Sequence, residues 1–549
     1  MKKINFLKII SILFYIFVFF FLLSNSYSYL DPDFGWHLKV GEQIVNEKAM
    51  PTFDYYDWTL EGKKWVDHEW LINVITFWLY NNFGYSGVNI FFALIILAIL
   101  IILKIFSQKY FLKEKNGSFF ILLFQTLGLM AMAPHLGVRM QEITLLFFLL
   151  LLVIIYHYEK NTLLNAKQFL PDKNYLTGQA KTKTLFWLLP VFYFWACLHP
   201  GFLIGIFIMF FWIAIKLIEI IIAKHKIAKF VDLNNKLSIK NIRIFFYFAF
   251  LSILITFLTP YGLELYKFLL GGYSNTFYMT NIQEWLPLYS FPILYWQILY
   301  TAFVATVILL SIIYAKQKKI NLWEILILLF FIFLAFKSKR HFPLLFIVSF
   351  PMVIKFFTDS FDFKEIFKKF PKKLFLVKSY LIIVFILIII SQFVKINFTP
   401  NPFLSFNNDY PQKAVVFLKN NPQYDNLNFF NPYGWGGYLI WTLPERKLFI
   451  DGRLPQYSFK NHTFLEEYLE FFDKEKLENK LTEYNINLVL LDVKEKKYKF
   501  NWFEKYFLDF NEDEINKSAN ENFLRDYLNS SNEWEKVYND KISNIYVKK

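Results

Sequence analysis

Long apolar runs separated by short polar connections occupy the first 397 positions of the chain. Each run covers about 17–22 residues, the length at which a helix crosses about 30 Å of hydrocarbon. The pattern therefore predicts a polytopic α-helical membrane protein with about eleven transmembrane helices. The predicted spans are 5–26, 87–106, 118–134, 141–158, 185–199, 202–222, 243–259, 293–314, 320–336, 342–357 and 379–397.

Two apolar segments need a separate interpretation. The segment 70–82 is too short to span and is interrupted by Asn73, so it predicts a helix at the membrane interface. The segment 5–26 follows Lys2 and Lys3 as in a signal peptide, but it is longer than a signal-peptide core. No small-residue cleavage site follows it, so we interpret it as an uncleaved first span.

The pattern changes at residue 398, beyond which only short apolar runs remain. Segments with strand-like and helix-like patterns alternate there, which predicts a small α/β domain. Helices are predicted at 409–420 and 464–484, strands at 426–430, 438–443, 447–450 and 488–492, and a closing hairpin at 537–547. The chain thus divides into a transmembrane domain, 1–397, whose first outer connection is 28–86, and a water-soluble domain, 398–549.

The net charge of +15 would indicate nucleic-acid binding in a soluble protein. Here the Lys and Arg residues lie mainly in alternate connections between spans, as the positive-inside rule describes, so we expect no nucleic-acid partner. The alternation places the N-terminus in the cytoplasm and domain 398–549 outside a bacterial cytoplasmic (inner) membrane. One basic cluster, Lys337–Arg340, falls on the outer side against the rule, which favours a functional role for it.

The first outer connection carries carboxylates directly after the first span. Asp31 and Asp33 would stand at the membrane surface, where a carboxylate can act as a general base or hold a divalent cation such as Mg²⁺ or Mn²⁺. The segment could also be a helix-ending turn, in which Asp and Pro are common. His37, His68 and Glu69 could support the carboxylates, although their spacing matches no recognised zinc pattern.

Cationic side chains follow at the predicted outer ends of later spans: Arg139, His199, Arg340 and His341. Ionisable residues at membrane depth are costly and usually face a cavity or a partner. Arginine grips phosphate oxygens in pairs, whereas each residue alone could simply extend to the interface. Together they predict an anion site opposite the carboxylates, suited to the phosphate of a lipid-linked donor.

Two glycine-containing segments of domain 398–549 predict either a binding site or ordinary turns. Glycine lets a ligand approach the backbone, and aromatic rings with polar groups suit sugar faces, which makes Tyr438, Asp451 and Arg453 candidates. Gly436-Gly437 could instead be a turn before a strand, and Asp451-Gly452 a turn after one. Arg453 could simply pair with Asp451 or meet lipid headgroups.

These residues resemble the GT-C superfamily of integral-membrane glycosyltransferases, which use polyprenyl-phosphate-linked sugars. Asp31-Pro32-Asp33 stands where that superfamily has its first-loop Asp. More narrowly, four segments resemble a group of uncharacterised bacterial membrane proteins: Asp31–Leu38, Trp65–Leu71, Gly436–Trp441 and Asp451–Arg453. Phe34 and Pro200 depart from the residues usual in that group.

The resemblance implies an inverting glycosyltransferase that moves a sugar from a polyprenyl-phosphate-linked donor to a glycan, lipid or protein acceptor outside the cytoplasm. Asp33 or Asp31 would be the general base, and the cationic residues would bind the donor phosphate. Two other functions remain open. A transporter or flippase of lipid-linked saccharides could use the same charges, although the inverted repeats common in transporters are missing. The other alternative is an envelope assembly protein without catalytic activity.

Overall fold

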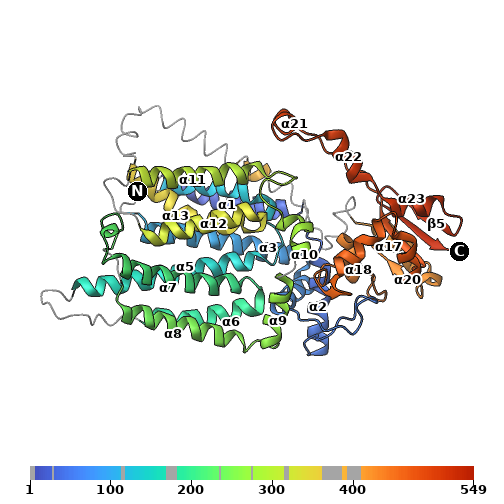
Figure 1. Ribbon diagram of the computed structural model, residues 1–549, viewed down its shortest axis with the longest axis horizontal. Helices are drawn as coiled ribbons and strands as arrows, with labels where there is room; N and C mark the ends of the chain where they lie inside the picture. Colours follow the sequence, from blue (N-terminus) through green and yellow to red (C-terminus); the bar gives the residue numbers. More distant parts are fainter. Residues whose placement is uncertain are drawn as a thin grey trace.

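The structure is a computed structural model, and it describes residues 6–27, 30–112, 118–168, 182–233, 237–273, 276–314, 321–360, 386, 388–391 and 410–549. A bundle of helices runs along the long axis of the molecule, and residues 410–549, here the C-terminal part, lie at one end of it (Figure 1). We call this end of the bundle the pocket end.

The bundle consists of α1 (Phe6–Ser26), α3 (Trp70–Tyr110), α4 (Ser118–Met132), α5 (Glu142–Gln168), α6 (Leu188–Leu198), α7 (Phe202–Ile222), α8 (Ile239–Thr256), α11 (Tyr295–Tyr314), α12 (Leu322–Lys337) and α13 (Phe342–Ser360). Seven helices of the described ranges are long and apolar enough to cross a membrane, and shorter apolar helices cover Phe120–His135 and Thr182–Leu198. Each predicted span up to 342–357 coincides with a helix. The last, 379–397, lies almost wholly outside the described residues, so the total of about eleven stays a prediction.

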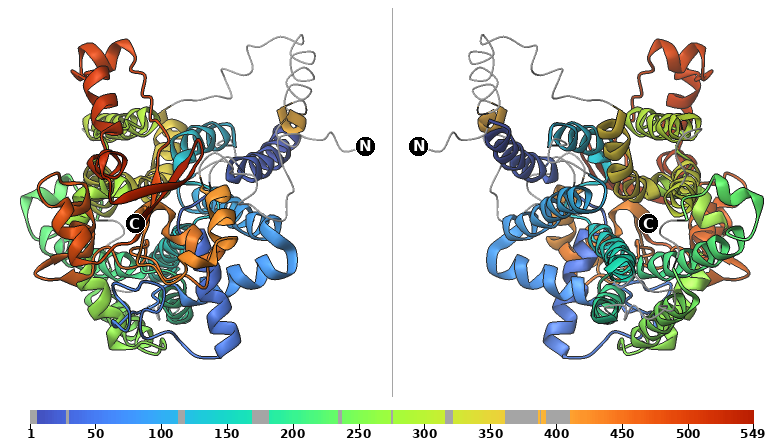
Figure 2. Two further views of the ribbon diagram at one scale, coloured as in Figure 1. Left: turned by 90° about the vertical axis from the view of Figure 1, so that its right-hand side faces the viewer. Right: turned by 90° about the vertical axis from the view of Figure 1, so that its left-hand side faces the viewer.

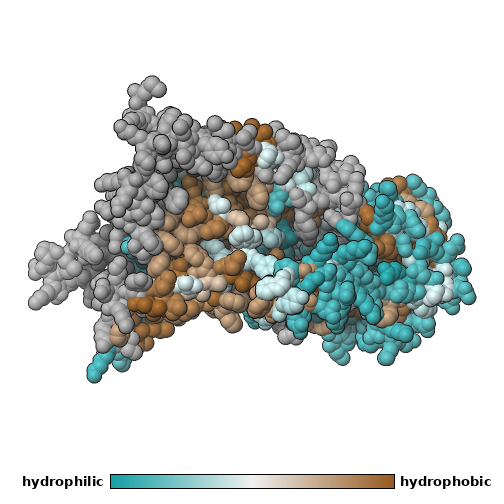
Figure 3. Space-filling model, turned by 90° about the horizontal axis from the view of Figure 1, so that it is seen from above, coloured by the Kyte–Doolittle hydropathy of each residue, from teal (hydrophilic) through white to brown (hydrophobic). Residues whose placement is uncertain are grey.

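Large apolar side chains are exposed along the bundle, among them Phe207, Phe250 and Phe333. Figure 3 shows this apolar surface over the bundle and a hydrophilic surface over the C-terminal part. Apolar patches of such extent are unusual where water is the solvent, whereas hydrocarbon accepts them. The chain is therefore a multi-pass membrane protein.

A bend in α3 joins two segments that the sequence analysis treated separately. Gly84 has φ 62° inside the helix, a conformation that glycine adopts without steric cost. The residues before it correspond to the predicted interfacial segment 70–82, and those after it contain the predicted span 87–106. The short helix thus exists, as the first part of α3, and its position at a membrane interface stays a prediction.

Several short elements lie between the bundle and the C-terminal part, including α2, α9 and α10 (Figure 1). They are α2 (Phe34–Glu47), α9 (Leu263–Tyr273), α10 (Thr276–Asn281) and the 3-10 turns η2 (Ala133–His135), η5 (Gln283–Trp285) and η6 (Lys339–His341). The C-terminal part packs against this region at α2.

The C-terminal part contains a four-stranded mixed sheet in the order β1-β4-β6-β5. Its strands are β1 (Phe429–Phe430), β4 (Leu488–Asp492), β5 (Trp534–Asn539) and β6 (Ser543–Lys548), and a separate hairpin pairs β2 (Ser458–Phe459) with β3 (His462–Thr463). Its helices are α17 (Gln412–Lys419), α18 (Gly436–Thr442), α19 (Phe464–Leu469), α20 (Leu477–Glu483), α21 (Trp502–Tyr506), α22 (Glu512–Asn520) and α23 (Phe523–Ser530). The mixture of strands and helices agrees with the predicted α/β class, and the predicted strand 488–492 and closing hairpin are present.

Two strand predictions in this part are wrong. Residues 438–443 fall mostly in α18, because Gly436 and Gly437 begin a helix that packs directly on α2. A β-carbon at Gly437 would lie 2.3 Å from the carbonyl oxygen of Pro32, so only glycine permits this approach.

Residues 447–450 form no strand of the sheet. Instead, the Leu448 N–H donates to the Tyr56 carbonyl at 2.8 Å, and the Trp58 N–H donates to the Leu448 carbonyl at 2.9 Å. The backbone groups of Leu448 are thus satisfied by the first connection, while the Asn431 side chain accepts from the Phe449 N–H and donates to the Ile450 carbonyl. Residues 30–86 and the C-terminal part are therefore packed together.

Candidate active site

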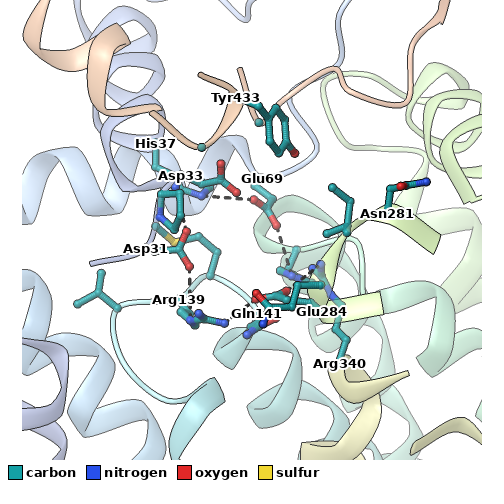
Figure 4. A pocket seen from close by; sticks show the side chains of 18 residues that line it. Asp31, Asp33, His37, Glu69, Arg139, Gln141, Asn281, Glu284, Arg340 and Tyr433 are labelled. Carbon is teal, nitrogen blue, oxygen red and sulfur yellow. Dashed lines mark hydrogen bonds and ion pairs between the residues drawn. The ribbon is translucent and has the colours of Figure 1, made fainter. Parts of the chain in front are cut away.

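A pocket of about 370 Å³ opens at the junction of the bundle and the C-terminal part (Figure 4). Seven of the predicted site residues line it: Asp31, Asp33, His37, Glu69, Arg139, His199 and Arg340. They come from five places in the chain: the start of α2, the starts of α3 and α5, the α6–α7 turn and η6. The fold thus gathers side chains that are far apart in the sequence.

The two aspartates of the first connection differ in their surroundings. Asp33 stands at the start of α2 but its side chain makes no capping hydrogen bond, so the carboxylate is turned to the pocket. Asp31 accepts a hydrogen bond from the Asp33 N–H at 3.0 Å, and its other oxygen lies 3.5 Å from Arg139 Nε. Within the described residues no basic side chain forms an ion pair with Asp33.

Burial, and then the nearby charge of Asp31, raise the pKa of Asp33 to about 7. Burial also raises the pKa of Asp31, while Arg139 acts in the opposite direction. A carboxylate whose pKa lies near neutrality takes up and releases a proton readily. Asp33 therefore has the properties of a general base, and Asp31 is the carboxylate held by a cation.

The cations lie on the opposite side of the pocket from Asp33 and are joined by Glu284 (Figure 4). Arg139 Nη1 lies 2.6 Å from one oxygen of Glu284, and Arg340 Nη1 lies 3.5 Å from the other. Burial opposes ionisation of Glu284, but Arg340 and Arg139 outweigh it and lower its pKa. Arg340 also stacks over the Trp285 ring at 5.0 Å, which fixes its direction.

The basic cluster that contradicts the positive-inside rule has two roles in the structure. Arg340 lines the pocket, whereas Lys339 is buried and donates to the carbonyls of Ser290 at 2.8 Å and Pro292 at 3.0 Å. These bonds hold η6 against the connection before α11. The sequence gives no signal for the role of Glu284, because its contacts with the two arginines arise only in the fold.

A hydrogen-bond chain fixes the proton positions of the histidines. The Asn73 amide N–H groups donate to Asp67 at 3.0 and 2.9 Å, so the Asn73 oxygen accepts from His37 Nδ1 at 2.6 Å. This assignment leaves His37 Nε2 as an acceptor, 3.9 Å from Glu69. Burial lowers the pKa of His37 to about 3, so the ring is neutral.

His199 has the opposite tautomer. Its Nδ1 accepts from the Gly201 N–H at 3.0 Å, so Nε2 carries the proton and lies 3.3 Å from Glu69. Burial, and then the charge of Arg340, lower its pKa well below the usual value. His199 is thus a neutral N–H donor. Burial, with Asp67 close by, raises the pKa of Glu69 to about 8.

The remaining predicted residues lie outside the pocket lining. The His68 ring packs on Phe268 and the His341 ring packs on Trp285. Tyr438 is buried against Tyr410, with ring centroids 4.9 Å apart. The C-terminal part reaches the pocket through other residues of the same two glycine-containing segments: Tyr433, Gly434 and Gly452.

Arg453 and Asp451 form a buried ion cluster behind the pocket. The Arg453 guanidinium contacts Asp451 through Nε at 3.0 Å and Asp54 through Nη2 at 2.7 Å. It lies between the Tyr56 and Trp65 rings, at 4.6 and 4.7 Å. Gly452, between these two residues, lines the pocket, and a β-carbon added to it would lie 2.1 Å from Asp33 Oδ1. The cluster thus positions the loop that touches Asp33.

A metal site was predicted at Asp31 and Asp33. Across the described part of the chain, no group of three or more His, Cys, Asp and Glu side chains is arranged to hold a metal ion. Asp31 is also engaged by Arg139. We therefore derive no catalytic step through a metal, and a Mg²⁺ or Mn²⁺ ion at these carboxylates stays a prediction.

A scan against protein-family models found no match, and a search of the curated proteins found none either. Solved structures with a similar fold do exist. The oligosaccharyltransferase of Archaeoglobus fulgidus, tethered with an acceptor peptide, aligns with a TM-score of 0.53 and 12% identity over 90% of this chain and 69% of that one.

The same archaeal protein, AglB, in complex with an inhibitory peptide and a dolichol-phosphate, aligns with a TM-score of 0.53 and 11% identity over 90% of this chain and 70% of that one. Its apo form gives a TM-score of 0.50 and 11% identity over the same shares of the two chains. This chain therefore has a fold similar to that of the archaeal oligosaccharyltransferase.

Proposed function

We propose that this protein is a membrane glycosyltransferase of the GT-C kind, which transfers a sugar from a polyprenyl-phosphate-linked donor to an extracytoplasmic acceptor. One observation carries the proposal: Asp33 faces Arg139 and Arg340 across a single pocket, and none of the described basic side chains forms an ion pair with it. The similar fold of an oligosaccharyltransferase solved with a dolichol-phosphate supports a lipid-linked donor.

The proposed reaction uses the two sides of the pocket differently. Asp33 accepts the proton of an acceptor hydroxyl or amine as the acceptor atom forms a bond with the anomeric carbon of the sugar. The bond from that carbon to the phosphate oxygen breaks, and its electron pair leaves with the lipid phosphate. Arg139 and Arg340 offset the charge of the departing phosphate. Attack from the side opposite the leaving group inverts the anomeric configuration.

The experiment that tests the proposal measures transfer from a radiolabelled pool of polyprenyl-phosphate-linked sugars in membranes that carry the protein. Label should move from the lipid-extractable fraction into an acceptor when the wild-type chain is present. If a broad donor pool gives no transfer, while labelled lipid binds and crosses the bilayer, the transporter function is favoured. If the donor pool is neither bound nor transferred, the assembly function is favoured.

Removing either pocket arginine should weaken donor binding. A hydrogen bond to a charged group contributes about 1.5–3 kcal/mol, so Arg139→Gln or Arg340→Gln should raise the dissociation constant of a polyprenyl phosphate about 10–100-fold. The exposed Arg243 at the start of α8 supplies the control, because Arg243→Gln removes the same charge away from the pocket. Equal affinity in all four proteins would contradict an anion site.

The transfer rate should rise with pH through about 7, because Asp33 must lose its proton to act as a base. The negative charge of Asp31 contributes to the raised pKa of Asp33, so Asp31→Asn should move the midpoint to lower pH. Initial rates between about pH 5.5 and pH 8.5 measure both effects. A flat profile, or a midpoint that stays fixed in the variant, would speak against Asp33 as the titrating group.

A further inference from the structure

An arm of the C-terminal part, residues 496–520, projects beside the pocket end of the bundle. Figure 1 shows α21, at its tip, level with the end of α11 along the long axis, and Figure 2 shows the arm reaching outward past the bundle. Two asparagines join the outgoing and returning segments of the arm. Asn520 exchanges two hydrogen bonds with the backbone of Lys496, and Asn516 does the same with Tyr498, all at 2.7–2.9 Å.

The arm is fastened to the bundle at the beginning of α11. The Phe291 ring packs against Tyr498 at 4.9 Å and Phe500 at 5.3 Å. The Asn501 side chain donates to the Tyr295 hydroxyl at 3.3 Å. Tyr295 is the first residue of a helix that is long and apolar enough to cross a membrane. The tip of the arm is therefore held where that helix would leave the hydrocarbon.

The tip itself is apolar and exposed to an unusual degree. Trp502 is 66% exposed, Tyr506 75% and Phe507 67%, although large aromatic side chains are normally well buried. Phe503 and Leu508 extend the same exposed surface. On α11, Trp296 and Leu299 are also exposed, so the apolar surface of the bundle carries on toward the arm.

The charges of the arm balance overall, but its lysines gather just before the tip. Residues 496–520 contain five lysines and five acidic residues, and Lys505 pairs with Glu512. Lys494, Lys496, Lys497 and Lys499 precede the tip, with Glu495 among them. Trp and Tyr favour the boundary between headgroups and hydrocarbon, and Lys beside them meets the phosphates. This combination of exposed aromatic rings and neighbouring lysines is typical of segments that lie in a membrane interface.

We propose that the arm inserts its tip, Trp502 to Leu508, into the headgroup region of the lipid bilayer beside α11. The occupant of this apolar surface is phospholipid rather than a second protein chain, because the tip lies level with the membrane end of α11. The insertion gives the C-terminal part a second attachment to the membrane, apart from its contacts with the first connection.

The test places a fluorescent reporter on the arm of the full-length chain in lipid nanodiscs. The buried Cys197 is replaced by Ala, and an environment-sensitive dye is attached at Tyr506→Cys or, in a second variant, at Phe507→Cys. A control dye is attached at Lys474→Cys, an exposed position just before α20 in the C-terminal part. The nanodiscs contain phosphatidylcholine and phosphatidylglycerol, with or without doxyl-labelled lipid.

Dyes at both arm positions should emit at shorter wavelength than the control dye and should be quenched several-fold more by doxyl-labelled lipid. Adding Trp502→Glu should reduce that quenching, because a carboxylate at the tip resists burial among lipids. Absence of lipid quenching at both arm positions would overturn the proposal. Protection from water without lipid quenching, present only when two chains share a disc, would overturn it in favour of a dimer contact.

Discussion

Asp33→Asn is expected to lower the rate of sugar transfer about 10²–10⁴-fold, the contribution of a general base in other enzymes. The amide has the shape of the carboxylate but cannot take the acceptor proton. Binding of the polyprenyl-phosphate donor should change little, because Arg139 and Arg340 on the other side of the pocket remain. Transfer and donor binding are measured in the same membranes at equal protein levels.

Two other variants make this result specific. Asp473→Asn alters an exposed carboxylate of the C-terminal part and should leave transfer unchanged. Asp31→Asn should retain more activity than Asp33→Asn, because Asp31 is the carboxylate paired with Arg139. Full transfer by the Asp33 variant, or a larger loss at Asp31, would remove Asp33 from the role of base.

Arg453→Met is expected to destabilise the protein by about 3–5 kcal/mol, the usual cost of removing one partner of a buried ion pair. The guanidinium contacts Asp54 and Asp451 and is fully enclosed by protein. Methionine fills part of the space but leaves both carboxylates without a cation. Thermal unfolding in detergent should occur at lower temperature, and protease should cleave between the bundle and the C-terminal part more readily.

The matched control uses a second ion pair between the same two parts of the chain. Lys447 pairs with Glu61, and both side chains are about half exposed. An exposed pair contributes only about 0–1 kcal/mol, so Lys447→Met should have little effect. If both variants destabilised the protein equally, the buried Arg453 cluster would have no special part in joining the first connection to the C-terminal part.

The helices and several pocket residues could be predicted from the sequence because their causes are local. An apolar run of sufficient length favours a helix in hydrocarbon wherever it occurs. Arg139 and Arg340 stood out because charges at membrane depth need a cavity or a partner, and the structure places both at the pocket. Their shared contact with Glu284 could not be read from spacing, since it depends on how three connections meet.

The predictions that were wrong or incomplete concern residues whose structure depends on contacts with distant parts of the chain. Gly436–Thr442 contains residues that favour strands, yet it is helical because its glycines allow close packing on α2. Arg453 was a candidate for sugar binding, for contact with lipid headgroups or for pairing with Asp451. It does pair with Asp451, but its second partner, Asp54, could not be predicted from the sequence. Tyr433 and Gly452 reach the pocket only because that pairing brings the C-terminal part over it. Long-range contacts decided each of these outcomes.

The pairing of Asp54 with Arg453, 399 positions apart, also sets the order in which the protein can mature. During synthesis, the first connection reaches its side of the membrane long before Arg453 is made. Until then Asp54 has no cation, and burying it would be costly. The first connection can therefore take its final shape only after nearly the whole chain has been synthesised and the C-terminal part has reached the same side of the membrane. A nascent or truncated chain would insert its helices and yet have no finished pocket.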